Sequence, residues 1–243
     1  MNQVNNSQLL PVAFLRRHFG TSRKALWVYA ILRQNGIGNA GYTRDHISFL
    51  QSYGIAKSTA YRVVASLRRK GWLVDSKSGI RITSVHTISE TKNKYCIPTP
   101  SSMLDSYKIF SNFIFTSLLL SKVQADFKRQ NRSSNIVLEK VNDEDYRSYD
   151  KWAACTTEEV ASKYIGISQP TFNRLKKSSA KSGMLTSRYA LDLKKSFGSK
   201  EEALNVLGWG SNSFRIQKIQ NKYVYVIGSI LNINSFLKVY KYS

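Results

Sequence analysis

The sequence contains few of the residues on which enzymes and metal proteins depend. Cys96 and Cys155 are the only cysteines among 243 residues, too few for a disulfide framework and too far apart for a CxxC zinc site. The three histidines form neither an HEXXH motif nor the HxH pair of a nickase, and no serine or cysteine nucleophile motif occurs. We therefore expect no enzymatic activity, no bound metal and no cofactor, in a reducing cytoplasmic setting.

Long apolar runs are also missing. The best membrane candidate, residues 109–120, is interrupted by four polar side chains, whereas a spanning helix needs about 20 apolar residues. The first eight residues, MNQVNNSQ, lack the apolar segment of a signal peptide. An apolar fraction of 42% is nevertheless enough to build packed cores. We expect a soluble protein that does not enter membranes.

Acidic residues are the most consequential shortage, because 15 Asp and Glu stand against 37 Lys and Arg, a net charge of +22. This excess favours nucleic acid as the partner, with an anionic membrane surface as the second candidate. Residues 1–98 carry a net charge of +12 and residues 151–243 one of +10, whereas residues 99–150 are neutral. The distribution predicts two basic domains, 1–98 and 151–243, joined by a linker at 99–150 that ends in an acidic loop.

Residues 54–73, GIAKSTAYRVVASLRRKGWL, predict a tight turn followed by a helix at about 57–70. Apolar residues recur at the three- and four-residue spacing of one buried face, and Gly71 follows the last turn, where a left-handed residue is favoured. The opposite face is basic and rich in hydroxyl groups, which suits the major groove of DNA. The expected buried residues are Ala60, Val63, Val64 and Leu67, and the candidate DNA-binding residues are Lys57, Ser58, Thr59, Tyr61, Arg62, Arg68 and Arg69.

Two predicted helices, at 22–35 and 44–53, precede this stretch, and a predicted hairpin at 72–82 follows it. This order of helix, helix, recognition helix and hairpin resembles the winged helix-turn-helix family. The resemblance implies that Ser58, Thr59, Tyr61 and Arg62 approach base edges. It also implies that Lys77 and Arg81, on the hairpin, lie near phosphates or the minor groove.

A long helix with a wide apolar face is predicted at 102–129, after a boundary marked by Pro98 and Pro100. The apolar stripe is too wide for a helix that is exposed on most of its surface. We interpret it as buried against the rest of the chain. The alternative is burial against a second copy, which would make the protein a homodimer through the 102–129 helix.

Residues 166–185, GISQPTFNRLKKSSAKSGML, repeat residues 54–73 at an offset of 112 without a gap, with seven identities in 20 positions. Most identities fall in the turn, the helix start and the helix end, where backbone geometry is most demanding. GISQPTFNR is similar to the turn and recognition-helix start of many bacterial repressors. Phe172 and Leu175 are expected in the core, whereas Lys176 departs from the apolar pattern and is expected to reach a phosphate. The candidate DNA-binding residues are Gln169, Thr171, Asn173, Arg174, Lys176, Lys177 and Lys181, with Arg188 on a wing at 186–193.

The expected fold class is mainly α with small β-hairpins: two winged helix-turn-helix domains joined by a long helix, the second with a terminal β-hairpin. We expect a sequence-specific protein that binds double-stranded DNA, in the first interpretation a transcription regulator associated with the nucleoid. The layout also resembles plasmid and phage replication initiators, which is the alternative interpretation. A DNA nickase or recombinase, with one of the 14 tyrosines as nucleophile, and an RNA-binding protein are weaker alternatives.

Overall fold

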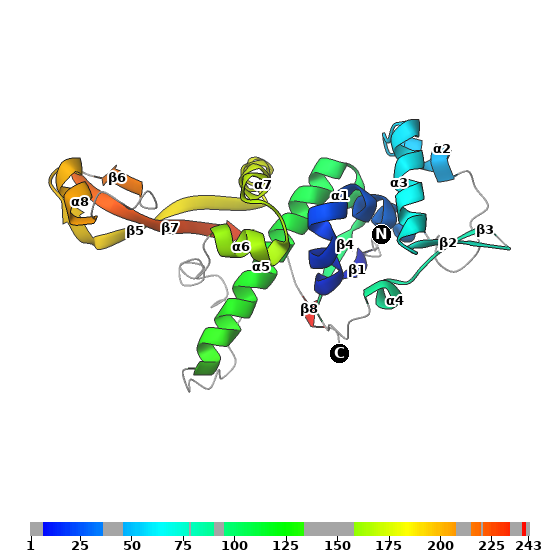
Figure 1. Cartoon of the computed structure of the whole chain (residues 1–243), viewed down its shortest axis with the longest axis horizontal. Coiled ribbons are helices and arrows are strands. Elements are labelled where there is room, and N and C mark those ends of the chain that lie inside the picture. Colours follow the sequence, from blue (N-terminus) through cyan, green and yellow to red (C-terminus); the bar gives the residue numbers. More distant parts are fainter. Residues whose placement is uncertain are drawn as a thin grey trace, which may run out of the picture.

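The computed structural model describes residues 7–35, 46–77, 79–89, 95–133, 158–207, 215–219, 221–233 and 240–241. The chain is mainly α-helical with small antiparallel sheets, as the sequence predicts (Figure 1). The acidic loop at 142–150 and Cys155 lie outside the described residues. Among the helices that are described, none is long and apolar enough to cross a membrane.

Helix α1 (Val12–Gln34) begins earlier than the predicted helix at 22–35. Ser22 has a non-helical backbone (φ −142°, ψ 32°), so the element consists of two helices joined at a kink. The predicted helix at 22–35 corresponds to the second of these two helices. Residues 25–32 are all buried, which makes this helix the centre of the core rather than an amphipathic surface helix.

Strand β1 (Ser7–Pro11) pairs antiparallel with β4 (Tyr95–Pro100), and β4 also pairs with β8 (Tyr240–Lys241). Pro98 and Pro100, which were predicted to mark a boundary, therefore lie inside a strand. They fit there because β8 pairs only with residues 95 and 96, so beyond that point one edge of β4 is free of a described partner.

The predicted stretch at 44–82 folds largely as expected. Helices α2 (His46–Ser52) and α3 (Lys57–Arg69) are followed by strands β2 (Leu73–Ser76) and β3 (Gly79–Ile82), which form an antiparallel hairpin. A short helix, α4 (Val85–Ser89), comes next. The predicted buried face of α3 is confirmed, since Ala60, Val63, Val64 and Leu67 are all buried.

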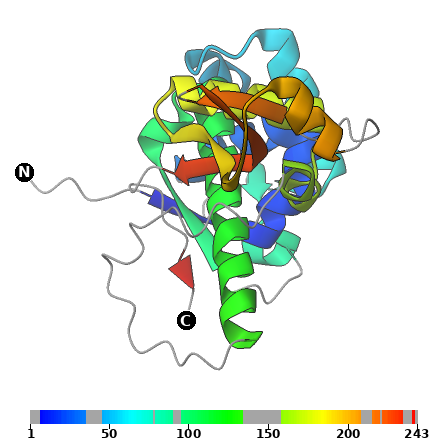
Figure 2. The ribbon, with the colours of Figure 1, turned by 90° about the vertical axis from the view of Figure 1, so that its left-hand side faces the viewer.

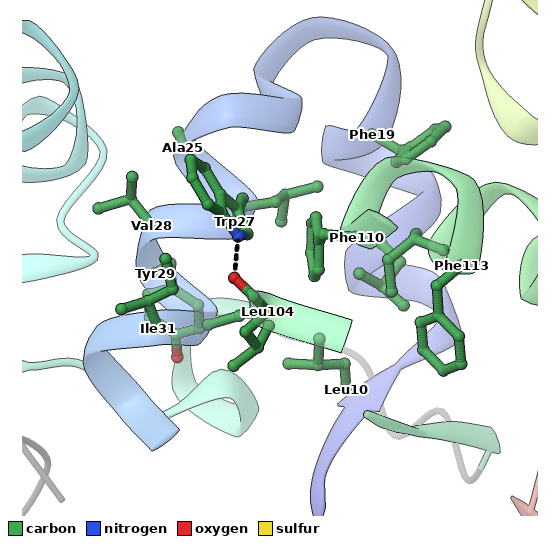
Figure 3. Close-up of a cluster of buried hydrophobic side chains, with 14 of the residues drawn as sticks. Leu10, Phe19, Ala25, Trp27, Val28, Tyr29, Ile31, Leu104, Phe110 and Phe113 are labelled. Carbon is green, nitrogen blue, oxygen red and sulfur yellow. Dashed lines mark hydrogen bonds between the residues drawn. The ribbon is translucent and has the colours of Figure 1, made fainter. Parts of the chain in front are cut away.

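The long helix α5 (Tyr107–Ser133) starts later than predicted, because residues 101–104 form a 3-10 helix, η1 (Ser101–Leu104). The indole nitrogen of Trp27 donates to the Leu104 carbonyl oxygen at 2.9 Å, and this hydrogen bond fixes the end of η1 against α1 (Figure 3). Residues 110–119 of α5 are buried by α1 and by later elements of the same chain. The wide apolar face is therefore covered without a second copy over this part of the helix.

The remaining elements form a helical pair and an extended arm. Helices α6 (Glu158–Ile165) and α7 (Gln169–Lys181) pack on α5. Strand β5 (Leu185–Phe197) leads to helix α8 (Lys200–Leu207), and strands β6 (Arg215–Ile219) and β7 (Lys222–Ile233) complete a sheet of order β5-β7-β6. The β5–β7 ribbon carries α8 away from the helices (Figure 1), and this arm projects toward the viewer in Figure 2. The expected local wing at 186–193 is thus part of a longer strand whose partner is β7.

One cluster of buried apolar side chains runs from Leu10 in β1 through α1, α3 and α5 to Leu185 at the start of β5. The cluster has members on both sides of residue 98, the predicted domain boundary. The three-part division of the chain stays a prediction, but the two helical regions share one core.

Candidate nucleic-acid interface

The structure contains the same backbone arrangement twice, in α2–α3 (the first helical pair) and in α6–α7 (the second helical pair). In both pairs each helix ends with a glycine whose amide donates three residues back, while the next amide donates five residues back. These are the two hydrogen bonds of the Schellman motif. The donors and acceptors are Gly54–Gln51, Ile55–Leu50, Gly71–Arg68 and Trp72–Leu67 in the first pair, and Gly166–Lys163, Ile167–Ser162, Gly183–Ala180 and Met184–Ser179 in the second.

The four capping glycines have left-handed backbone angles, with φ of 72° and 67° at Gly54 and Gly71 and of 76° and 69° at Gly166 and Gly183. A residue with a Cβ is strained in this conformation. The 112-residue offset seen in the sequence is therefore repeated in each of these hydrogen bonds and backbone turns. The predicted internal repeat is confirmed as a repeat of local structure.

The exposed face of α3 carries a ridge of residues that follow one another at intervals of about one helical turn: Ser58, Arg62, Ala65 and Arg69. Lys57 and Tyr61 are also exposed, whereas Thr59 is partly buried. Lys77 and Arg81 are exposed on the hairpin that follows. Arg62 has no ion-pair partner among the described residues. The ridge therefore presents hydrogen-bond donors and positive charge to solvent.

The corresponding face of α7 is formed by Pro170, Arg174, Lys177 and Lys181, all exposed. These are the residues that the 112-residue offset pairs with the α3 ridge, so an arginine occupies the same place on both helices. Gln169 is exposed, and Thr171 and Asn173 are partly buried beside the ridge. Lys177 replaces Ala65, which makes the second ridge more basic along its middle.

Two predicted site residues are held by carboxylates of the same chain. Arg68 donates to the Asp75 carboxylate at 2.9 Å and so ties α3 to strand β2, although both side chains remain exposed. Lys176 forms an ion pair with Glu158, and its side chain is only 16% exposed. The prediction that Lys176 reaches a DNA phosphate is wrong, because the lysine lies between α6 and α7 and neutralises a carboxylate there.

Other expectations for the second pair are resolved by the structure. Phe172 and Leu175 are buried, as predicted, and Ser179, which stands where the first pair has Leu67, is fully buried next to α5. Ser168 occupies the N-cap position of α7, but its hydroxyl donates to the Thr171 hydroxyl rather than to a backbone amide. Arg188 lies within β5, where its backbone is in register with Ile230 of β7.

Helix α1 contacts both helical pairs, through residues that were not among the predicted site residues. A Cβ added at Gly20 would lie 1.8 Å from the Gly166 carbonyl oxygen, so α1 crosses the second turn at backbone contact. Arg16 donates from Nε to the Tyr164 carbonyl oxygen at 2.9 Å, and its guanidinium lies 3.8 Å from the centre of the Tyr164 ring. The glycine in an otherwise helical stretch was the available sequence signal for a close backbone approach.

The two exposed ridges point along different directions, because α7 is seen end-on in the view that shows α3 side-on (Figure 1). Helix α1 packs against α3 of the first pair and against α6 of the second pair. A single helix therefore relates the orientations of the two pairs. A target that contacts both ridges must present two sites in this fixed geometry.

The only histidine on α1 lies in an aromatic cluster at the base of the first pair. The ring centre of His18 is 4.7 Å from that of Trp72 and 5.2 Å from that of Phe14. Burial of the imidazole lowers its pKa to about 4, and the nearby charges of Lys70 and Arg17 act in the same direction. The ring is therefore neutral near pH 7 and packs as an aromatic side chain.

Comparison of the chain with protein-family models, with curated proteins and with solved structures gave no match.

Proposed function

We propose that this protein binds double-stranded DNA sequence-specifically through two recognition helices, α3 and α7, each in a winged helix-turn-helix unit. The observation that carries the proposal is the pair of matched exposed ridges, with Arg62 and Arg174 at equivalent places on equivalent backbones. Arginine is the side chain that most often reads guanine in the major groove. The net charge of +22 supports a polyanionic partner.

The hairpin β2–β3 supports the same proposal for the first unit. It follows α3 directly and carries exposed Lys77 and Arg81, as a wing that contacts the backbone beside the recognition helix would. The β5–β7 ribbon occupies the corresponding position after α7. Because both helices belong to one chain, the second contact is intramolecular, so a monomer occupies two half-sites about 10 bp apart.

Transcription regulation in the cytoplasm is the biological role that we propose first. Replication initiation is the second, and the observation that favours it is the long helix α5, which packs against α1 and against α6 and α7. A long helix between two DNA-binding domains resembles the layout of plasmid and phage initiators. Direct repeats of the selected binding site next to the gene would favour an initiator. A single site overlapping a promoter would favour a regulator.

The test begins with selection of bound sequences from a random duplex pool, followed by footprinting of the selected site. We expect protection over two half-sites with different sequences, since the two ridges carry different residues at three of four positions. Arg62→Ala and Arg174→Ala should each weaken binding to the selected site by about 1–3 kcal/mol and relax the preference within one half-site only.

Arg68→Ala is the matched control, because it removes an arginine from the same helix whose charge is already paired with Asp75. We expect it to change affinity less than Arg62→Ala does. Equal losses on selected and random duplexes for Arg62→Ala would show a phosphate contact instead of base recognition. A wild-type affinity that is independent of salt would contradict DNA binding altogether.

A further inference from the structure

The kink in α1 opens a hollow of about 330 Å³ between α1, α3 and the start of α5. The kink at Ser22 lies within the lining, and the space is lined by residues from both helices. Three of them are cations, Arg23, Lys24 and Arg62, and the others include the hydroxyl-bearing residues Thr21, Ser22 and Ser66. None of the lining residues carries a carboxylate.

The three cations keep their charges available to a ligand. The Arg23 guanidinium lies 5.5 Å from the Phe19 ring centre, and the Lys24 ammonium lies 5.7 Å from that of Tyr107. Aromatic faces orient cations without neutralising them. Among the described residues, none of the three cations forms an ion pair, so the hollow concentrates positive charge and hydrogen-bond donors around one space.

The position of the hollow connects the two exposed ridges. Arg62 belongs both to the α3 ridge and to the lining of the hollow. Gly20 also lines the hollow and is in backbone contact with Gly166, in the turn that leads into α7. The hollow therefore adjoins both Arg62 of the α3 ridge and the turn that leads into α7.

We propose that the hollow binds the sugar-phosphate backbone of DNA between the two half-sites, with Arg23 and Lys24 each contacting a phosphate. Charged and hydroxyl donors match the acceptor-only oxygens of a phosphodiester, and such contacts set the register of a protein on DNA without reading sequence. The inference rests on the proposed function. It adds two residues of α1, a helix outside both helical pairs, to the DNA contacts.

The test compares the double variant Arg23→Gln/Lys24→Gln with a control of equal charge change, Lys200→Gln/Lys222→Gln. Both control lysines are exposed, at the first residues of α8 and β7, and α8 lies at the far end of the arm (Figure 1). On a duplex with both half-sites, we expect the first variant to bind at least tenfold more weakly at about 0.15 M salt. The slope of log K against log salt should become shallower by about 1.8, since each neutralised phosphate contributes about 0.9.

A neutral DNA backbone locates the contact. Methylphosphonate linkages placed between the half-sites should weaken wild-type binding but leave the affinity of Arg23→Gln/Lys24→Gln unchanged, because its contact is already lost. Linkages placed outside the half-sites should affect both proteins equally. Thermal unfolding of each variant separates lost binding from lost folding, and both substituted side chains line an open space, so we expect unchanged midpoints.

Three outcomes would overturn the inference. One is an affinity and a salt slope for Arg23→Gln/Lys24→Gln equal to those of wild type, while wild type binds the selected duplex; the proposed function would then survive alone. Another is a loss no larger than that of the Lys200→Gln/Lys222→Gln control. The third is calorimetric binding of inorganic phosphate or ATP that the substitutions abolish without any effect on DNA affinity, which would make the hollow a site for a small anion. Failure of wild type to bind any duplex would refute the proposed function itself.

Discussion

The two helical pairs have the same backbone but different interiors. Beneath α3 the buried residues are small or aliphatic, and they adjoin an aromatic cluster around Trp72 and Tyr29. Beneath α7 the equivalent positions include the large Phe172, the ion-paired Lys176 and the hydroxyl of Ser179. The turn and cap geometry is therefore set locally by glycines and hydrogen bonds, whereas the buried face of each helix fits a different neighbouring helix.

The neighbours explain the difference. Helix α7 packs on α5, where a ring contact joins Phe172 to Phe115 at 5.2 Å and polar contacts join Asn112 to Ser179 and Ser182. A small hydroxyl at 179 lets the two helices approach closely, while Phe172 fills the space beside it. Helix α3 instead packs on α1 and α2, and Ala60 suffices at the position equivalent to Phe172.

The largest loss of stability should come from Phe172→Ala, which places at 172 the residue that the first pair has at the equivalent position, Ala60. The side chain is fully buried, so we expect a loss of about 3–5 kcal/mol in the free energy of unfolding. Urea unfolding measures the loss, with Tyr61→Ala as control, because Tyr61 is 56% exposed and should change stability little. A loss below about 1 kcal/mol would mean that α5 does not depend on α7 for its packing.

Gly20→Ala should cause the next largest loss of stability, because it disrupts the backbone contact between α1 and the turn before α7. The new Cβ would meet the Gly166 carbonyl oxygen, a backbone atom, at 1.8 Å, so α1 and the second turn must separate. We expect a loss of about 1–3 kcal/mol, as for other overpacked sites. Gly198→Ala is the control, since its Cβ would meet only the flexible Glu202 side chain at 3.6 Å. Equal unfolding midpoints for the two variants would rule out the backbone contact.

Variants of the Lys176–Glu158 ion pair test whether the buried face of α7 can be made apolar, like the buried face of α3. Glu158→Gln leaves a partly buried lysine and should cost about 1–2 kcal/mol, below the 3–5 kcal/mol of a fully buried pair. The double variant Lys176→Val/Glu158→Gln places at 176 the residue that the first pair has at Val64, and it should recover most of that loss. Chemical denaturation of both variants checks the recovery. A double variant less stable than Glu158→Gln would show that the charge is required.

The smallest effect should appear in the pH dependence of stability, through His18 of α1, which packs at the base of the first pair. Its pKa is lowered to about 4 from an ordinary value of 6.5, so the unfolded chain takes up the proton first as pH falls. Stability should therefore decrease between pH 6.5 and 4, by less than the limit of about 1.4 kcal/mol per pH unit, because the ring is partly exposed. His18→Phe should flatten this part of the profile relative to wild type. The same slope in both proteins would assign the titration to other groups.

Local features of the structure could be predicted from the sequence. The glycines at 54, 71, 166 and 183 and the apolar spacing of α3 act within a few residues, so the turns, both second helices and the first hairpin follow from the residues themselves. The strand pair β6–β7 was predicted in the same way, from apolar runs around a polar turn. The charge pattern also indicated which faces of α3 and α7 stay exposed.

Features that depend on distant residues were missed. Strand β4 includes two prolines and looks like a linker until β1 lies beside it. Lys176 looks like a solvent-exposed cation until α6 brings Glu158 to it, and Arg23 and Lys24 acquire a common space with Arg62 only through the kink in α1. The partner of β5 is separated from it by a helix and another strand. Each of these depends on a contact that periodicity in one segment cannot contain.

The sheet β1-β4-β8 has a consequence for the order in which the chain is made. Strands β1 and β4 leave the ribosome early, but β8 follows only after the second helical pair and the arm have been synthesised. Until then the outer edge of β4 at Tyr95 and Cys96 lacks this partner, and an open strand edge is a site for pairing with other chains. The sheet β1-β4-β8 can thus be completed only after the second helical pair and the arm have been synthesised. A nascent chain halted before β8 should therefore be the form most prone to aggregate.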